Sequence, residues 1–203
     1  MSAGLYIFGF GGHARSVADV ALSAGIKQLL FIDPKARVGE MFAGFPAVTQ
    51  LPQPVDSNWH AFPASGDNAL RRKICAGMTI PLLALIARTA SIGVEAVVEE
   101  GVFVGEHAHV GAGARIGKGA IINSGAIVEH ETFIGAFTHI SVNATVAGRC
   151  HIGTETLIGA GATVLDRIRI CDRAIVGAGA TVVSDLAEPG VYVGTPARLI
   201  KGA

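Results

Sequence analysis

One histidine of the chain has acidic neighbours on both sides, in the segment Glu129-His130-Glu131. A carboxylate beside an imidazole favours the protonated ring and strengthens the neutral ring as a base. Histidine is the usual residue for removing a proton from an attacking amine or hydroxyl group, a role that contributes ~10²–10⁴-fold to the rate. The segment therefore predicts a general base at His130. The residues alone leave open a second reading, an exposed histidine beside two surface acids.

A second group of residues, near the N-terminus, could bind phosphate. Gly9, Gly11 and Ala14 match G-x-G-x-x-A after an apolar run, and Asp33 follows about twenty residues later. The start of a helix at residues 12–14 would face the phosphates, and Asp33 could accept a hydrogen bond from a base or ribose. Only one βαβαβ half fits here, whereas a dinucleotide needs two. We therefore expect a pocket for a mononucleotide or sugar nucleotide; the alternative is that these glycines only pack strand against helix.

The elements that would position this loop can be read from residues 1–87. Apolar runs at 5–8 and 29–32 predict buried strands, and a weaker strand is expected near 59–62. The helix after the glycine loop has an apolar face and ends at Gly25, and a second helix begins near Ser65-Gly66-Asp67-Asn68. This order is typical of a half-Rossmann α/β domain.

A second domain is expected at residues 88–203, where a repeat with a period of six is followed by a C-terminal tail. Isoleucine or valine occupies every sixth position from Ile92 to Val182, sixteen times without an insertion. The residue four places later is usually small, and the residue directly after the aliphatic one is often glycine. Such a period predicts a triangular coil of 18 residues, with the aliphatic and small residues inside, the glycine at the corner, and stacked coils paired as parallel strands about 4.8 Å apart.

The repeat also sorts the remaining candidates for chemistry. Five histidines fall on outward positions, and no two of them are 18 residues apart, so a metal-dependent hydratase with stacked imidazoles is disfavoured and no metal is expected. They are His107, His109, His130, His139 and His151. Cys150 occupies an inward position and Cys171 has no histidine beside it, which disfavours an acyl-cysteine intermediate.

The composition limits which binding partners and which cellular compartment we expect. Lysine plus arginine and aspartate plus glutamate are both 16, so a formal charge of zero gives no reason to expect nucleic acid or an anionic membrane as a partner. No apolar run is long enough to span a bilayer, and no signal peptide is evident. The three cysteines have no CxxC spacing, which suits a reducing compartment. We expect a soluble, cytoplasmic protein.

Several segments resemble the hexapeptide-repeat acyltransferases, and in particular the branch with UDP-4-amino-sugar N-acetyltransferases and sialic acid O-acetyltransferases. They are V-G-A-G-A, I-G-K-G-A and I-G-A-G-A in the repeat, V-E-H-E-T-F-I-G around His130, G-x-G-G-H and S-G-D-N-A-L-R-R-K before it, and G-V-Y-V-G-T-P-A-R near the end. The resemblance covers nearly the whole chain. It implies a left-handed parallel β-helix, a homotrimer with active sites between neighbouring prisms, and acetyl-CoA as co-substrate.

The resemblance also implies roles for individual residues. His130 corresponds to the catalytic base and Glu131 to the carboxylate that raises its basicity. Acetyl-CoA contacts are implied for His139, Ala160 and Ala178, and sugar-nucleotide contacts for Gly11, Gly12, His13, Asp33 and Gly66. Two positions depart from the family pattern: Pro34 replaces a polar residue after Asp33, and Ala87-Arg88 stands where His-Pro is frequent.

These observations combine into one expected reaction. The acceptor is a nucleotide-linked, UDP-type amino sugar, and His130 takes a proton from its amine as the nitrogen attacks the thioester of acetyl-CoA. A backbone N–H or the Asn123 side chain would stabilise the oxyanion. Two alternatives stay open: O-acetylation of a sialic acid or related sugar hydroxyl, and a non-catalytic β-helix that only binds nucleotide sugars.

Overall fold

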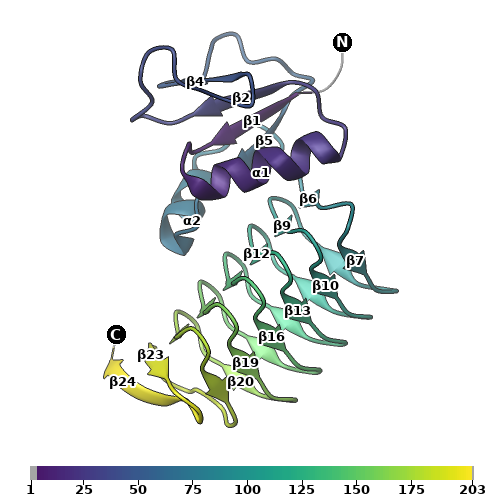
Figure 1. Cartoon of the computed structure of the whole chain (residues 1–203), viewed down its shortest axis with the longest axis vertical. Coiled ribbons are helices and arrows are strands. Elements are labelled where there is room, and N and C mark those ends of the chain that lie inside the picture. Colours follow the sequence, from purple (N-terminus) through teal and green to yellow (C-terminus); the bar gives the residue numbers. More distant parts are fainter. Residues whose placement is uncertain (1–3, 203) are drawn as a thin grey trace.

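The computed structural model describes residues 4–202 and shows two parts stacked along the long axis of the molecule (Figure 1). A small α/β part forms one end, and a prism of stacked coils forms the rest. Within the described residues, no helix has both the length and the apolar character needed to cross a bilayer.

The N-terminal part contains a parallel sheet in the order β4-β2-β1-β5, with β3 antiparallel to β4 at the edge. The predicted strands and both predicted helices are present. One connection differs from the predicted βαβαβ pattern: no helix joins β2 to β5, and the hairpin β3–β4 and a loop make this crossover. The bounds are β1 Leu5–Phe8, α1 Gly12–Ser23, β2 Leu29–Ile32, β3 Met41–Phe42, β4 Phe45–Val48, β5 His60–Pro63 and α2 Asn68–Ala76.

The remainder is the expected left-handed parallel β-helix, with two-residue strands on three faces. The docking face holds β6 Leu85–Ile86, β9 Phe103–Val104, β12 Ile121–Ile122, β15 His139–Ile140, β18 Leu157–Ile158 and β21 Ile175–Val176, extended by β23 Gly190–Val193 and β24 Arg198–Gly202. The uncharged face holds β7 Ser91–Ile92, β10 His109–Val110, β13 Ile127–Val128, β16 Thr145–Val146, β19 Thr163–Val164 and β22 Thr181–Val182. The outer face holds β8 Val97–Val98, β11 Arg115–Ile116, β14 Phe133–Ile134, β17 His151–Ile152 and β20 Arg169–Ile170.

The interior of the prism follows the period of six. Aliphatic residues such as Val128 are fully buried, and the residue four places later is buried beside them. Where that residue is threonine, its hydroxyl donates to a backbone carbonyl, as Thr132 Oγ1 does to Ala147 O at 2.9 Å. Polar atoms inside the coil are thereby satisfied.

The role expected for the glycines was wrong in one respect. The corner residue with left-handed φ lies three places after the aliphatic residue, and it is often not glycine: Glu131 and Arg149 both have φ 57°. The glycine directly after the aliphatic residue is instead needed for close approach between coils. A Cβ on Gly111 would lie 2.5 Å from the backbone nitrogen of His130.

The N-terminal part packs on the docking face. The outward side chains of Phe103 and Ile121 are buried there with Leu85, in one cluster with residues of α1 and the N-terminal sheet. Leu85 pairs with Phe103, so the docking face begins with β6. The apolar outward residues of this face thus fix the α/β part on the prism, close to the coils that follow.

Candidate active site

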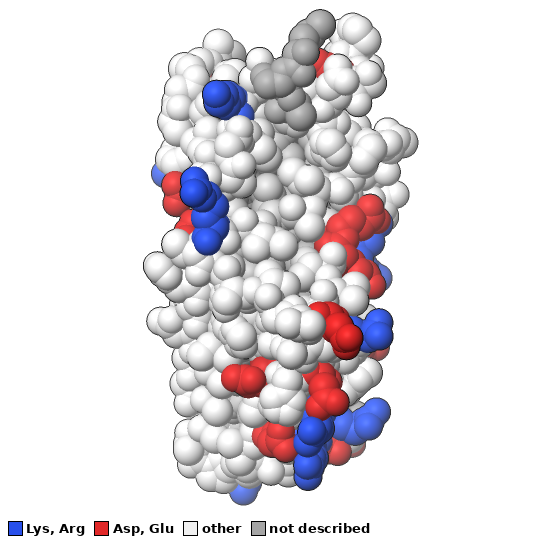
Figure 2. Space-filling model, turned by 90° about the vertical axis from the view of Figure 1, so that its right-hand side faces the viewer, with Lys and Arg blue, Asp and Glu red and all other residues white. Residues whose placement is uncertain are grey.

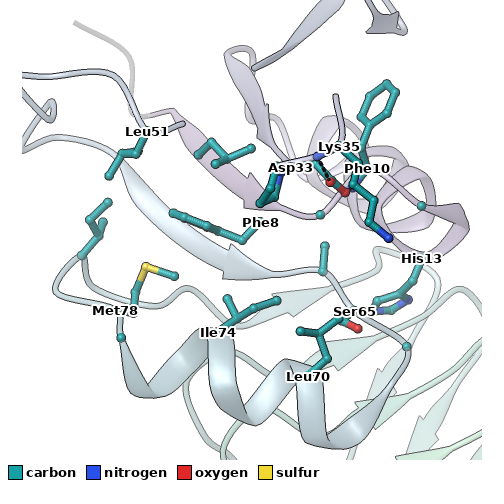
Figure 3. A pocket seen from close by; sticks show the side chains of 18 of the residues that line it. Phe8, Phe10, His13, Asp33, Lys35, Leu51, Ser65, Leu70, Ile74 and Met78 are labelled. Atoms are coloured by element: carbon teal, nitrogen blue, oxygen red, sulfur yellow. Dashed lines mark hydrogen bonds between the residues drawn. The ribbon is translucent and has the colours of Figure 1, made fainter. Parts of the chain in front are cut away.

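A cavity of about 970 Å³ lies at the carboxyl ends of β1, β2 and β5, with α2 on its other side (Figure 3). This end of a parallel sheet is the usual ligand site of doubly wound folds. One end of the cavity is lined by the glycine loop, His13, Asp33 and Ser65. The other end is apolar and is lined by Phe8, Ile32, Leu51, Ile74, Met78 and Ile80.

The glycines of the loop separate into two kinds. Gly9 has φ +127°, and a Cβ there would lie 2.8 Å from Ala64 O, so the fold requires glycine. A Cβ on Gly11, Gly12 or Gly66 would meet no atom within 4 Å, and none of the three has a left-handed φ. All three line the cavity. Packing therefore explains Gly9 but not the other three, whose missing side chains leave room in the cavity.

The N-terminus of α1 opens into the same cavity. Gly11 is its N-cap residue and provides no side-chain cap, and the first turn holds no acidic residue. The first N–H groups of a helix lack intrahelical acceptors and carry a partial positive charge. An uncapped helix start of this kind is suited to a phosphate group.

Asp33 is placed beside this loop but its carboxylate is already engaged. Its Oδ2 accepts a hydrogen bond from Phe10 N at 2.9 Å, and its Oδ1 accepts one from Lys35 N at 2.8 Å (Figure 3). Asp33 therefore holds the glycine loop against the end of β2, and any contact to a ligand is additional to these two bonds.

His13 lies at the floor of the cavity, against the prism. Its ring packs edge-on against Phe103 with 5.0 Å between centroids. Burial, with smaller contributions from His139 and Arg71, lowers the pKa of His13 to about 3. Its Nε2 is buried, and among the described residues it has no hydrogen-bond partner. A neutral imidazole with a free nitrogen is thus available at the cavity.

His139 extends from the docking face toward the same region. Burial, followed by the charge of Arg71, lowers its pKa to about 4, while the backbone of Gly66 acts in the opposite direction. Asn123 Nδ2 lies 3.1 Å from His139 Nε2 and donates to it, which requires that nitrogen to be unprotonated. The structure brings His13, Gly66, Asn123 and His139 together, although they are distant in sequence.

A buried arginine holds this region in place. Arg71 is fully buried, and its guanidinium donates to Ser65 O at 2.8 Å, Gly119 O at 2.6 Å and Phe137 O at 2.6 Å, as well as to the Asn68 side chain. These acceptors belong to both parts of the molecule. Arg71 therefore joins the cavity wall to two successive corners of the prism.

His130 and Glu131 lie elsewhere, at the corner between β13 on the uncharged face and β14 on the outer face. His130 Nδ1 is 3.3 Å from Glu131 Oε2, which also accepts from Arg149 Nε at 2.8 Å. Arg149 and, to a lesser degree, His130 lower the pKa of Glu131, so the carboxylate is ionised. The imidazole is thus oriented by an acid that an arginine of the next coil holds in turn.

One detail of the predicted imidazole environment was wrong. Glu129 does not face the ring of His130: its Oε2 accepts from the His130 backbone nitrogen at 3.3 Å. Of the two flanking acids, only Glu131 contacts the imidazole.

Ala160 and Ala178 lie one above the other at a different corner, between the docking and uncharged faces. Gly179 N donates to Ala160 O at 2.9 Å across this corner. Within the described part of the chain, the backbone N–H groups of Ala160 and Ala178 have no protein acceptor. Because the preceding residues Gly159 and Gly177 carry no side chain that could cap them, both groups are free to donate to a ligand.

The structure consequently divides the predicted site residues between two edges of one prism. His130 and Glu131 lie on the edge between the uncharged and outer faces, which we call the His130 edge. Asn123, Ala160 and Ala178 lie on the edge between the docking and uncharged faces, which we call the Asn123 edge, and His139 lies on the docking face beside it. A single chain does not bring the two groups together.

Comparison with known proteins bears on both parts. The family model of the PglD N-terminal domain matches residues 4–78. The hexapeptide repeat of succinyl-transferase matches residues 90–118, 96–130 and 150–184. The acetyltransferase domain of PglB from Neisseria gonorrhoeae is 30% identical, with a TM-score of 0.92 over 98% of this chain and 100% of that chain. The chain belongs to the hexapeptide-repeat sugar acetyltransferase family.

Two further structures show what related acetyltransferases bind. The PglB domain is also known in complex with acetyl coenzyme A, again at 30% identity and a TM-score of 0.92, over 98% of this chain and 99% of that chain. A histidine-to-asparagine variant of perosamine N-acetyltransferase from Caulobacter crescentus, in complex with CoA and GDP-perosamine, is 30% identical, with a TM-score of 0.91 over 98% of this chain and 97% of that chain. The present protein is accordingly an acyltransferase.

Sequence reasoning missed two residues of this acetyltransferase. Arg149 is 18 residues after Glu131, the length of one coil, so the period of six could have placed it beside the predicted carboxylate. Arg71 has no such signal, because its acceptors depend on how α2 lies against the prism.

Proposed function

We propose that this acetyltransferase moves the acetyl group of acetyl-CoA to the amino group of a nucleotide-linked sugar. The proposal depends on the combination of two features. Gly11, Gly12 and Gly66, which packing does not explain, surround the uncapped start of α1. The same chain also presents the imidazole of His130, which the carboxylate of Glu131 orients. The first feature suits a diphosphate and the second a general base. The CoA and GDP-perosamine bound by the Caulobacter relative support the same pair of substrates.

The reaction follows from these groups. The amine nitrogen attacks the thioester carbonyl carbon, His130 accepts one proton from that nitrogen, and Glu131 stabilises the resulting imidazolium. The tetrahedral oxyanion accepts a hydrogen bond from a backbone N–H or from Asn123. The carbon–sulfur bond then breaks, the CoA thiolate takes up the proton, and the sugar leaves as an N-acetyl amide.

We favour UDP over GDP as the nucleotide. A guanine edge presents two adjacent N–H donors that suit both oxygens of one carboxylate, whereas uracil presents one. Each oxygen of Asp33 already accepts one hydrogen bond from a backbone nitrogen, which disfavours this double contact, and Pro34 adds no polar group. The apolar lining beyond Asp33 suits the faces of a pyrimidine. His13, with its free Nε2, and the N–H groups of Gly12 and Ala14 would contact the diphosphate.

The active form we propose is a homotrimer in which the His130 edge of one chain meets the Asn123 edge of the next. This arrangement would bring His130 of one copy to Asn123, His139, Ala160 and Ala178 of its neighbour. The uncharged face supports such packing, because its outward residues are serine, histidine, isoleucine and threonine, and Figure 2 shows a broad surface with few charged side chains.

The proposal is tested by thiol release from acetyl-CoA with UDP- and GDP-linked 4-amino-4,6-dideoxy sugars, together with calorimetric titration of each sugar. We expect thiol release with at least one amino sugar and tighter binding of the UDP-linked form. Nucleotide-sugar binding without thiol release from any acceptor would contradict the enzymatic proposal. Tighter binding of the GDP-linked sugar would contradict only the choice of base.

A further inference from the structure

Gly148 lies directly next to the imidazole of His130, one coil further along the His130 edge. It is two places after Val146, and each of the other fifteen residues at this position of the repeat carries a side chain, including alanine at Ala112 and Ala136. Its φ lies outside the left-handed region. The fold therefore does not require glycine at this position.

The neighbours of Gly148 explain the missing side chain. A Cβ built on it would lie 2.6 Å from His130 Nε2 and 3.1 Å from Asp166 Oδ1. Asp166 is one more coil along the same edge, so the three residues form a column in which an imidazole and a carboxylate lie on either side of an empty position. The second oxygen of Asp166 is 3.4 Å from Arg167 Nε, which leaves Oδ1 directed at the column.

The two nitrogens of His130 consequently have different surroundings. Nδ1 contacts Glu131, whereas Nε2, the nitrogen that would take the proton, faces the space above Gly148. A group that donates a hydrogen to Nε2 in this space lies between the imidazole and the Asp166 carboxylate. The carboxylate can then accept only a second hydrogen on the same group.

We propose that Asp166 selects an amine over a hydroxyl as the acceptor; the inference rests on the proposed function. An amine nitrogen has two hydrogens, one for Nε2 of His130 and one for Oδ1 of Asp166. A hydroxyl has a single hydrogen, so its oxygen lone pairs would face the carboxylate without a donor between them.

Asp166 is chemically unchanged by the acetyl transfer. The nitrogen–carbon bond forms as Nε2 takes one proton, and the carbon–sulfur bond breaks as the thiolate leaves and is protonated. The second hydrogen stays on the nitrogen as the N–H of the product amide, still bonded to Asp166. An ester product would have no hydrogen at this position.

The test compares Asp166→Asn with the wild-type enzyme on two ligands. The first is an amino sugar, GDP-perosamine or its UDP-linked analogue. The second is the matching sugar with a hydroxyl in place of the amine. We expect kcat/KM for the amino sugar to fall about 10- to 100-fold, the loss typical of one hydrogen bond to a charged group. The inhibition constant of the hydroxyl sugar, measured in the same assay, is expected to stay the same or to fall, because the amide of the variant can donate a hydrogen bond to the hydroxyl oxygen. Asp172→Asn is the matched control, because Asp172 occupies the same position of the next hexapeptide on another edge.

The selection by Asp166 would be overturned if Asp166→Asn weakened binding of the hydroxyl sugar as much as it lowered kcat/KM for the amino sugar, or if it left kcat/KM for the amino sugar unchanged. Neither result would contradict the proposed acetyltransferase activity. Failure of the wild-type enzyme to acetylate any amino sugar would overturn the proposed function instead. Gly148→Ala tests the empty position itself. This residue type is already accommodated at Ala112 and Ala136, so we expect normal thermal unfolding together with loss of acetyl transfer as the Cβ displaces the imidazole.

Discussion

The three histidines near the proposed chemistry differ because their surroundings differ. His130 is half-exposed and has an ionised carboxylate against Nδ1, whereas His13 and His139 are covered by the contact between α/β part and prism. An imidazole beside an ionised acid is suited to take up a proton, and a buried neutral imidazole is suited to donate or accept a fixed hydrogen bond. We therefore propose that the same residue type serves two purposes in one molecule.

Replacement of His130 tests its proposed role as the general base. We expect His130→Ala to lower kcat by ~10²–10⁴-fold, the usual contribution of a general base. Glu131→Gln should have a smaller effect in the same direction, because the imidazole remains but loses its ionised partner. KM for acetyl-CoA should change little in both variants, which steady-state kinetics would show.

His151→Ala serves as the control, since His151 lies on the outer face and stacks on Phe133 with 4.7 Å between ring centroids. Turnover of His130→Ala within threefold of the wild-type rate would remove His130 from the role of base.

At the scale of elements, the contact of α1 and α2 with the docking face makes stability sensitive to acid. His13 and His139 have folded-state pKa values of about 3 and about 4, below the ordinary value of 6.5. The unfolded chain therefore binds protons that the folded chain does not, and stability present above pH 6.5 is lost as the pH falls from there toward 4.

We expect the free energy of unfolding to fall by up to roughly 1.4 kcal/mol per pH unit for each of these histidines within that window. His139→Asn removes one of the two contributions. The free energy of unfolding of this variant, measured by urea titration, should therefore fall less steeply between pH 6.5 and 4.5. His107→Asn, at an exposed corner, should keep the wild-type slope. A slope unchanged by His139→Asn would show that burial of this imidazole does not control the acid response.

The elements also show what could be predicted from sequence and what could not. In the prism, the period of six fixes which residue lies above which. The inward residues, such as Val128 and Thr132, and the outward histidines could therefore be predicted residue by residue. The same rule places Arg149 one coil beyond Glu131 and Asp166 two coils beyond His130, although reading single segments did not reveal them.

No sequence period predicts the contact between the α/β part and the prism. Arg71 meets Gly119 and Phe137 through packing of α2 on corners that no period relates to it, and the hairpin β3–β4 follows a short turn at Ala43 and Gly44 rather than a long apolar pattern. Asp33 shows a third limit, because only the structure reveals that its carboxylate is bonded to the backbone.

At the scale of the whole molecule, a single chain carries two incomplete halves of the proposed site. His130 and Glu131 lie on one edge of the prism, and His139 with Asn123 lies at another, beside the nucleotide cavity. In the proposed homotrimer, a closed ring of identical subunits, the His130 edge of each chain would lie against the Asn123 edge of the next. Each trimer would then contain three sites, each formed by two chains.

Complementation between two inactive variants measures this directly. His130→Ala and His139→Ala are each expected to lose acetyl transfer, and an equal mixture, unfolded and refolded together, should regain about a quarter of the wild-type activity, because mixed trimers contain one site with both histidines. Thiol release from acetyl-CoA gives the rate, and the two variants refolded separately and then combined give the background. Recovery near a quarter is the predicted result; a mixture no more active than the separately refolded variants would contradict a site shared between chains.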